Sequence, residues 1–442
     1  MSVEVPSFVA TALSRVRGAP AFERRGRVSQ LVGLTVESEG PVASVGDLCR
    51  ITPAGGGPDV LAEVVGFRQD RLLLMPLSST RGISPGSEVR TVGRPLSYPC
   101  GPGLKGRVLN GLGDPIDDAG PLLGCPAREL HQASGVTPPL QRQRITKPFN
   151  TRIKVLDTLI PCGQGQRLGI MAGSGVGKST LLGMMAGQAE ADVNVIALIG
   201  ERGREVREFL ERDLSEIGRQ RSVVVVATSD EPAMVRLKGA FLAMDIAAYF
   251  RDQGLNTLFM MDSVTRFAMA QREIGLSAGE PPATRGYPPS VFALLPQLLE
   301  QAGNSALGSM TAFFTILTES DDLQDPVADA CRAILDGHVV LSRELANAGH
   351  YPAIDVLGSV SRLNSDLLSA AERRLGTRLR EWMSLYRKNQ DLIQIGAYTS
   401  GTQPTLDAAI RAQDAINAFL RQDEHEGVET QKAWQMLQKV LS

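Results

Sequence analysis

Several features that would assign this chain of 442 residues to a specialised class are missing from it. No run of about 18 apolar residues occurs, so the sequence predicts no transmembrane helix. The N-terminus has no basic leader followed by an apolar block, and we therefore expect no cleaved signal peptide. The 46 basic and 48 acidic residues nearly cancel, which argues against a bulk basic surface for nucleic acid or anionic membrane.

Cysteine and histidine are scarce and scattered. The five cysteines form no CxxC pair, and the four histidines form no HExxH motif. This pattern fits reduced cytosolic thiols and argues against a disulfide framework or a zinc site. Any metal chemistry is therefore expected to come from Mg²⁺ bound with a nucleotide.

The first part of the chain divides into two regions by composition. Residues 1–25 are predicted to be a short helix with a basic tail, either a frayed terminus or an amphipathic segment that docks a partner or membrane surface. Residues 26–97 hold short apolar runs between Gly and Pro turns, which predicts a small β-barrel. Because Phe67 is its one aromatic residue and its charges balance, we interpret this barrel as structural or oligomer-forming.

The rest of the chain is of mixed and then helical character. Residues 98–372 alternate apolar strands with helices, which predicts a parallel sheet covered on both faces. The segment 203–220 is predicted to be one helix with charge pairs four residues apart. Residues 373–442 have helical periodicity around a central turn and predict a helical domain.

A glycine-rich loop follows a predicted strand and opens a predicted helix. Its residues are Ala172, Gly173, Ser174, Gly175, Val176, Gly177, Lys178, Ser179 and Thr180. Glycines let backbone N–H groups turn inward around phosphate oxygens, and the helix N-terminus adds partial positive charge. This is a P-loop, with Ala172 at the first glycine of the usual pattern. Lys178 is expected to reach the β- and γ-phosphates of ATP, and Ser179 to give its hydroxyl oxygen to Mg²⁺.

Two acidic residues are candidates to share this site. Asp262 ends an apolar strand in a Walker B pattern, which predicts a carboxylate that holds Mg²⁺ through water. Ser263 and Arg266 follow, and either lines the site or caps the next helix. Glu201 ends another predicted strand and is a candidate to orient or deprotonate the attacking water, the alternative being a solvated strand end.

Longer motifs carry a resemblance to a known family. GERGREV around Glu201, the P-loop and MMDSVTRFAMAQREI together resemble the catalytic subunits of F-type and V-type rotary ATPases. Within that superfamily they are most similar to the ATPases of flagellar and injectisome type III protein export, from about residue 26 to about residue 420. The resemblance implies an α/β fold with an N-terminal β-barrel, a central RecA-like P-loop domain and a C-terminal helical domain.

The resemblance also implies roles for single residues. Glu201 matches the catalytic glutamate, and Arg202 matches its neighbouring active-site arginine. Arg362 matches an arginine finger that reaches the γ-phosphate of the adjacent subunit, typically worth about 10³–10⁵ in rate. Tyr351 lies where the family stacks an aromatic ring on adenine, the alternative being a buried core tyrosine. The loop at Tyr287 resembles the segment that faces the central channel, the alternative being loop packing.

Other members of the superfamily fit less well. A non-catalytic subunit is expected to lack Glu201, and an RNA translocase is expected to carry an aromatic, basic N-terminal domain, so we expect no nucleic-acid partner. The acidic shaft-contacting motif of a rotary synthase β subunit is not found. Between the two export machines, the segments at 250–254, 269–282 and 386–398 favour the flagellar one, whereas the segment around Cys162 favours injectisome relatives.

The resemblance therefore implies a Mg²⁺-dependent ATPase that works as a homohexameric ring. It implies a cytoplasmic enzyme at the inner membrane, at the base of a type III export apparatus that is most similar to the flagellar one. The implied work is the release of export substrates from chaperones and their delivery to the export gate. The implied partners are a stator-like negative regulator, a central stalk protein, chaperone–substrate complexes, the export gate and peripheral anionic lipid.

Overall fold

The computed structural model describes residues 24–130, 138, 140, 142–318 and 325–442. The docking segment predicted at residues 1–25 therefore lies outside the described residues except for its last two. The chain divides into two compact units, Met1–Leu96 and Ser97–Ser442. Within the described ranges, no helix is long and apolar enough to cross a bilayer.

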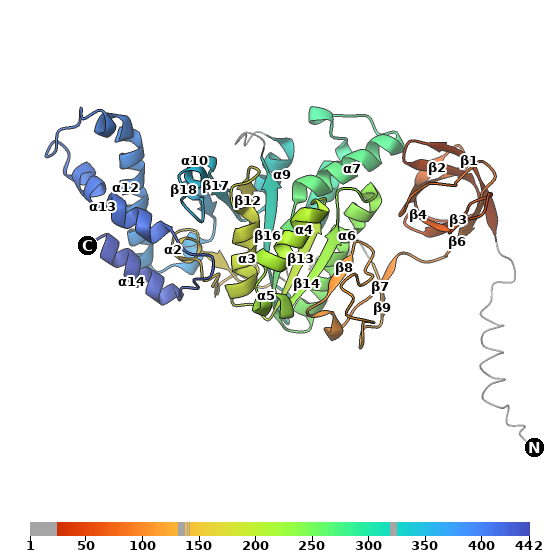
Figure 1. The fold of residues 1–442 in the computed structure, drawn as a ribbon, viewed down its shortest axis with the longest axis horizontal. Helices are drawn as coiled ribbons and strands as arrows, with labels where there is room; N and C mark the ends of the chain where they lie inside the picture. Colours follow the sequence, from red (N-terminus) through yellow and green to blue (C-terminus); the bar gives the residue numbers. More distant parts are fainter. Residues whose placement is uncertain (1–23, 131–137, 139, 141, 319–324) are drawn as a thin grey trace, which may run out of the picture. The chain divides into compact units, whose positions relative to one another are not determined.

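The first unit is a closed antiparallel barrel, coloured red to orange in Figure 1, with strand order β1-β2-β5-β4-β3-β6. The bounds are β1 Arg25–Val32, β2 Thr35–Glu39, β3 Leu48–Thr52, β4 Val60–Arg68, β5 Arg71–Pro76 and β6 Glu88–Thr91. Because successive residues of a strand point to opposite faces, one set fills the interior, and Val36, Ile51, Val64 and Leu74 are fully buried there. The predicted β-barrel is confirmed.

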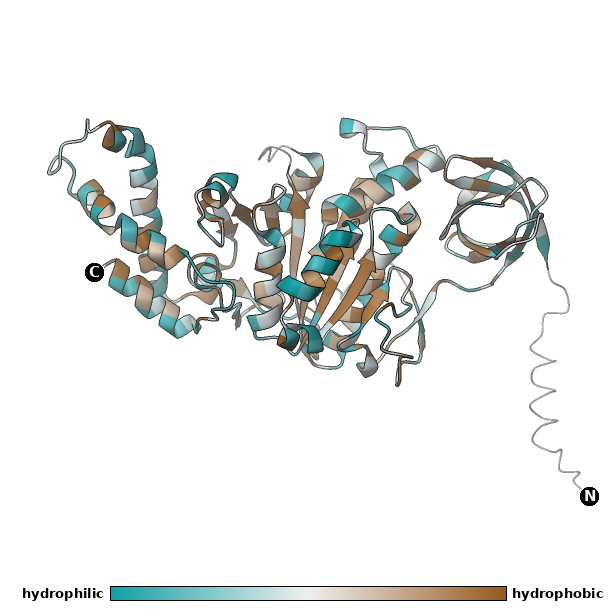
Figure 2. Cartoon of the chain, viewed as in Figure 1, coloured by the Kyte–Doolittle hydropathy of each residue, from teal (hydrophilic) through white to brown (hydrophobic). Residues whose placement is uncertain are grey.

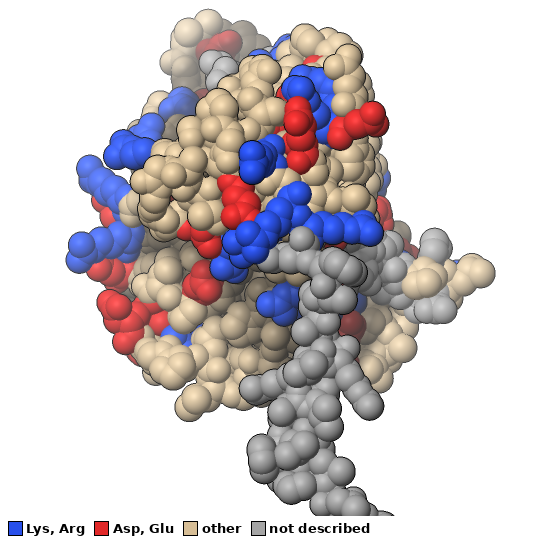
Figure 3. Space-filling model, turned by 90° about the vertical axis from the view of Figure 1, so that its right-hand side faces the viewer, with Lys and Arg blue, Asp and Glu red and all other residues tan. Residues whose placement is uncertain are grey.

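Several charged side chains on this barrel are paired with the opposite sign. Arg68 and Arg71 both contact Glu37, at 3.0 and 3.6 Å, and Arg25 contacts Glu88 at 2.9 Å. On the face drawn in Figure 3, blue and red side chains accordingly lie next to one another. Exposed pairs of this kind contribute little stability, but they prevent a field of one sign across that face.

The second unit is built on a sheet with strand order β18-β17-β12-β16-β15-β13-β14-β8. Neighbouring strands run parallel, except that β18 is antiparallel to β17. Their bounds are β8 Val108–Asn110, β12 Arg167–Ala172, β13 Val193–Ile199, β14 Ser222–Ala227, β15 Asn256–Asp262, β16 Ser309–Leu317, β17 Gly337–Leu341 and β18 Ile354–Ser361. Two small antiparallel pairs accompany the sheet: β7 Ser97–Pro99 with β9 Ala127–Glu129, and β10 Pro148–Phe149 with β11 Cys162–Gly163.

Helices cover both faces of this sheet (Figure 1). Every residue of β13 and β14 is buried, as expected for parallel strands covered on both sides, and the strands of the sheet are mostly brown in Figure 2. The helices are α2 Lys154–Leu159, α3 Lys178–Gln188, α4 Gly203–Glu208, α5 Glu216–Gln220, α6 Ala233–Asp252, α7 Val264–Ala278, α8 Pro289–Leu299, α9 Pro326–Ile334, α10 Arg343–Asn347, α11 Asn364–Leu367, α12 Ala370–Gln394, α13 Pro404–Leu420 and α14 Thr430–Val440. Single turns η1 Pro102–Leu104, η3 Phe209–Asp213 and η4 Thr284–Gly286 complete the described elements.

The C-terminal helices share a core with the sheet. Ser369 and Glu372 form a capping box that starts α12. Helices α12, α13 and α14 pack on one another and on α2. Phe419 and Leu437 belong to the same buried cluster as Leu181 of α3 and Ile196 of β13. The predicted α/β fold class, with its C-terminal helices, is confirmed.

The single helix predicted for segment 203–220 is wrong. Helix α4 ends at Glu208, one π-turn follows as η3, and α5 begins after Ser215, whose hydroxyl accepts the N–H of Gly218 at 3.1 Å. Leu214 leaves the helical conformation and is buried. Burying that leucine and capping a new helix contribute more than exposed pairs such as Arg204–Glu208.

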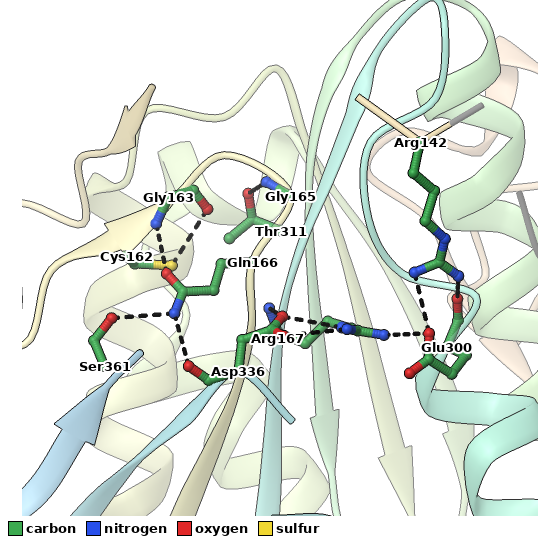
Figure 4. A network of polar contacts seen from close by, with 10 residues as sticks. All are labelled: Arg142, Cys162, Gly163, Gly165, Gln166, Arg167, Glu300, Thr311, Asp336 and Ser361. Atoms are coloured by element: carbon green, nitrogen blue, oxygen red, sulfur yellow. Dashed lines mark hydrogen bonds and ion pairs between the residues drawn. The ribbon is translucent and has the colours of Figure 1, made fainter. Parts of the chain in front are cut away.

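A polar network fixes the amino end of the central strands (Figure 4). Arg167, at the start of β12, donates two hydrogen bonds to Asp336, each of 3.1 Å, and also contacts Glu300. Gln166 donates to the Asp336 carbonyl and to Ser361 Oγ, both at 3.1 Å. Since Ser361 ends β18, this network fixes where the antiparallel strand stops.

Candidate active site

The P-loop has the backbone conformation that its glycines allow. Gly175 and Gly177 have φ of 76° and 88°, in the left-handed region that favours glycine. Ala172 is the fully buried last residue of β12, and Lys178 begins α3. The strand–loop–helix predicted from the sequence therefore presents the N-terminus of α3 at the carboxyl edge of the sheet.

Arg343 covers the beginning of this loop. Its Nη2 atom donates to the Ser174 carbonyl at 3.2 Å, and a Cβ on Gly173 would lie 2.8 Å from that nitrogen. Gly173 is thus the residue that allows the guanidinium to approach the backbone. Sequence reasoning assigned Arg343 no role, because its place beside the loop depends on β17 lying next to β12.

Lys178 and Asp262 form a direct ion pair. Lys178 Nζ donates to Asp262 Oδ1 at 2.6 Å, and Thr315 Oγ1 donates to the same oxygen at 2.8 Å. Burial opposes the charged form of Lys178, but the charges of Asp262 and Glu201 outweigh it and raise the lysine pKa. The lysine is therefore held charged, close to where phosphates would lie.

Glu201 brings a second carboxylate to the same lysine. Its Oε1 atom lies 3.7 Å from Lys178 Nζ and is buried without a hydrogen-bond partner. Burial and the charge of Asp262 raise the pKa of Glu201 to about 8. A hydrogen bond with Glu201 lowers the pKa of the nearby Glu205. A buried oxygen without a hydrogen-bond partner is free to accept a hydrogen bond from a ligand or water.

The two arginines near Glu201 are placed differently. Arg202 is exposed and lies 3.7 Å from Glu205, so within this chain it faces solvent. Arg266 packs against Gly200, where a Cβ would lie 2.7 Å from the arginine Cβ, and its Nε is buried without a hydrogen-bond partner. Ser263 caps α7 by accepting the Arg266 N–H at 3.3 Å. Of the two open alternatives, Ser263 therefore caps the helix and Arg266 borders the site.

Tyr351 borders a pocket beside the P-loop. The ring is 46% exposed, so it is not a buried core tyrosine. A Cβ on Gly177 would lie 3.3 Å from the ring. The pocket has a volume of about 360 Å³ and is lined by the start of α3, by Tyr351 and by residues 422–424 of the C-terminal region. The sequence gives no indication that residues 422–424 line this pocket, because their position depends on how the C-terminal helices pack.

Two other predicted residues lie away from this group. Arg362 follows β18, which runs antiparallel, so it lies at the amino edge of the sheet, where its Nη2 donates to the Arg332 carbonyl at 3.0 Å. Tyr287 is buried, with its ring 6.2 Å from that of Phe292 and 5.3 Å from the Arg272 guanidinium. These contacts are those of the loop-packing alternative.

The donor chemistry of the carboxyl edge fits a nucleotide with its metal. Asp262 and the Ser179 hydroxyl supply the hard oxygen ligands that Mg²⁺ prefers. Within the described part of the chain, no cluster of three or more His, Cys, Asp or Glu could hold a metal by itself. The P-loop, the lysine and the two carboxylates on neighbouring strands define a P-loop nucleoside triphosphatase of the RecA-like kind.

Comparison with known proteins narrows this class. The nucleotide-binding domain of the ATP synthase alpha/beta family matches residues 152–361, and the beta-barrel domain of the same family matches residues 28–93. The T3SS EscN ATPase C-terminal domain matches residues 368–439. The chain belongs to the ATP synthase alpha/beta family, in the branch of flagellum-specific and type 3 secretion system ATPases. The resemblance drawn from the motifs is confirmed.

Relatives from both export machines are similar over nearly the whole chain. The flagellum-specific ATP synthase of Bacillus subtilis is 50% identical over 403 residues, 91% of this chain and 92% of that protein. The type 3 secretion system ATPase of Xanthomonas euvesicatoria is 48% identical over 423 residues, 96% and 95% of the two chains. The assembled ATPase EscN of enteropathogenic E. coli matches with a TM-score of 0.90 at 42% identity, covering 94% of this chain and 100% of that one. EscN in complex with its central stalk EscO matches with a TM-score of 0.86 at 41% identity, with the same coverage.

Proposed function

We propose that this protein hydrolyses ATP with Mg²⁺ to energise type III protein export. The observation that carries the proposal is the meeting of Lys178, Asp262 and Glu201 beside the P-loop, where one Glu201 oxygen has no hydrogen-bond partner. Each of the three groups has a task in phosphoryl transfer, and none of the three tasks duplicates another.

The residues divide the chemistry between them. The backbone of the P-loop binds the phosphates, and Lys178 exchanges the Asp262 oxygen for phosphate oxygens. Asp262 and Ser179 hold Mg²⁺, which supplies charge neutralisation for the phosphates when it is bound. Glu201 orients the attacking water and accepts its proton, a task suited to a carboxylate whose pKa lies near neutrality. Tyr351 stacks on the adenine in the pocket beside Gly177.

Arg362 serves a neighbouring subunit rather than its own P-loop. It lies at the amino edge of the sheet, whereas Lys178 lies at the carboxyl edge, so its own nucleotide is out of its reach. An arginine supplied by the adjacent copy makes the complete site a product of assembly. The relative EscN has been solved as an assembled ATPase and in complex with its central stalk EscO. By analogy, we propose that this chain forms a ring of identical subunits, a homohexamer, which binds a central stalk protein.

The export role follows from the family rather than from the site. We favour the flagellar apparatus because the segments at 250–254, 269–282 and 386–398 resemble it. The virulence injectisome is the alternative, because relatives of both kinds match at similar identity. In this role the ring lies in the cytoplasm at the inner membrane and releases substrates from chaperones for delivery to the export gate. A stator-like negative regulator and anionic lipid are its further proposed partners.

The test removes the base without changing the shape of the site. Glu201→Gln is expected to lower kcat by about 10²–10⁴ while ATP binding is retained, because a general base contributes rate rather than affinity. In cells that lack the gene, the wild type is expected to restore filament assembly or effector secretion, and Glu201→Gln is not. Full activity of purified Glu201→Gln would remove Glu201 as the base. Export restored by that variant would remove hydrolysis as the source of energy.

A further inference from the structure

Gln422 is a buried amide at the meeting point of three segments that are distant in sequence. It follows α13 and is 7% exposed. Its Oε1 accepts the N–H of Lys154 at 2.8 Å, and its Nε2 donates to the carbonyls of Arg152 and Glu426 at 2.8 and 2.6 Å. The side chain thus uses its acceptor and both donors, so no other residue type of this size fits these partners.

The backbone of Gln422 contacts the loop that carries Tyr351. Its N–H donates to the Tyr351 carbonyl at 3.0 Å. The Tyr351 ring and Gln422 both line the pocket that begins at Gly177 of the P-loop. The position of the exposed Tyr351 ring beside the P-loop therefore depends on the position of the Gln422 backbone. The hydrogen bonds of the Gln422 side chain fix that backbone.

A buried lysine fixes the same stretch from the other side. Lys154 Nζ donates to the Arg421 carbonyl at 2.7 Å and lies 6.0 Å from the centre of the Phe419 ring. Lys154 is 4% exposed, so this contact is shielded from water. Residues 421 and 422 are thus held by both the main chain and the side chain of one residue at the start of α2.

We propose that Gln422 is a positioning residue for the nucleotide base. By fixing the Tyr351 loop against the start of α2, it sets the ring at stacking distance from the base and makes base affinity depend on the C-terminal helical domain. The inference rests on the proposed ATPase function and on stacking by Tyr351. It assigns Gln422 no contact with the phosphates and no part in proton transfer.

The test separates binding of the base from binding of the phosphates. Gln422→Glu keeps the shape but turns a carboxylate towards two carbonyls, and Gln422→Met removes all three hydrogen bonds. Both variants are expected to raise the KM for ATP about tenfold, with kcat at saturation changed less than about threefold, because stacking contributes roughly that factor per base. The inhibition constant of ADP should rise in parallel, whereas that of inorganic pyrophosphate, which has no base, should stay constant.

Three further variants control for structural loss. Gln188→Met removes another amide that ties α3 to the C-terminal region, through the Glu424 carbonyl at 2.8 Å, without touching Tyr351. It is expected to leave the KM for ATP unchanged. Tyr351→Ala should raise the KM for ATP at least as much as Gln422→Glu, and the double variant should be no worse than Tyr351→Ala alone.

The outcomes distinguish the inference from the function on which it rests. A wild-type protein without ATPase activity would overturn the proposed function. An active wild type in which Tyr351→Ala raises the KM but both Gln422 variants behave like Gln188→Met would overturn only the role of Gln422. Equal losses for ADP and pyrophosphate, with a fall in melting temperature, would likewise overturn it in favour of a structural role.

Discussion

Acidic and basic side chains gather at both edges of the central sheet, but they are paired differently at the two edges. At the amino edge, Arg167 lies between Asp336 and Glu300, and Arg142 also contacts Glu300, so every charge in this network has a partner of opposite sign. At the carboxyl edge, two carboxyl groups share one lysine, Asp262 at 2.6 Å and Glu201 at 3.7 Å, so acidic groups outnumber cations there.

The difference shows what each edge is for. A network in which charges are matched one for one holds strands in register. A cluster with two carboxyl groups for one cation is incompletely paired at a cost in stability, which a nucleotide with its metal relieves on binding. Active chemistry is therefore expected at the edge where pairing is incomplete.

The largest expected effect comes from a change at Arg362. This residue lies at the amino edge of its own sheet, but we propose that it completes the site at the carboxyl edge of the neighbouring subunit. Arg362→Ala should lower kcat by about 10³–10⁵. Lys178→Ala should be as inactive, because its P-loop loses the phosphate contact. Mixing the two inactive proteins should restore part of the activity, since one interface then has an intact lysine and an intact arginine. Verified mixed rings without any rescue would place the arginine's role within its own subunit.

The next effect tests whether the amino edge is purely structural. Arg167→Met keeps the aliphatic stem but leaves Asp336 and Glu300 without their shared cation. The expected result is a free energy of unfolding lower by about 2–3 kcal/mol, as for the loss of hydrogen bonds to charged groups. At saturating ATP and at a protein concentration that preserves assembly, kcat should be unchanged. A large fall in kcat in the folded variant would contradict the division between the edges.

A smaller effect is expected from the hydroxyl that fixes Asp262. Thr315→Val removes the 2.8 Å hydrogen bond to Asp262 Oδ1 without changing the shape of the side chain. We expect the Mg²⁺ requirement and kcat to worsen by about tenfold, since one hydrogen bond to a charged group contributes about 1.5 kcal/mol. Thr315→Ser should restore most of the loss.

The matched control for Thr315 lies on the same strand at the other edge. Thr311 is also fully buried in β16, but its hydroxyl accepts the Gly165 N–H at 3.0 Å. Thr311→Val should therefore lower stability and leave the Mg²⁺ dependence as it is. Equal Mg²⁺ dependence in the two valine variants would remove Thr315 from the site.

Local patterns in the sequence predicted the fold and the P-loop, lysine and carboxyl groups that the structure brings together, because each depends on a short stretch. The P-loop, the apolar strand before Asp262 and the glutamate at position 201 are each complete within about ten residues. Thr315, Arg343 and Gln422 were not predicted, because each gains its partner through pairing of distant segments. The end of α4 was mispredicted for a related reason: Leu214 is buried in a core cluster that distant segments form together.

The last prediction concerns the pH dependence of stability in the nucleotide-free protein. Burial and the charge of Asp262 raise the pKa of Glu201 from 4.5 to about 8, so between these values the folded state binds a proton that the unfolded state has lost. The contribution of this group to stability is present below about pH 4.5 and is lost as the pH rises towards 8, by at most about 1.4 kcal/mol per pH unit.

Glu201→Gln cannot lose that proton, so its denaturant midpoint should fall less than that of the wild type between pH 5 and 8. The matched variant Glu300→Gln, at the paired edge, should follow the wild-type slope. Parallel curves for the wild type and Glu201→Gln would mean that the carboxyl edge is as well satisfied as the amino edge, and the contrast between the two would fail.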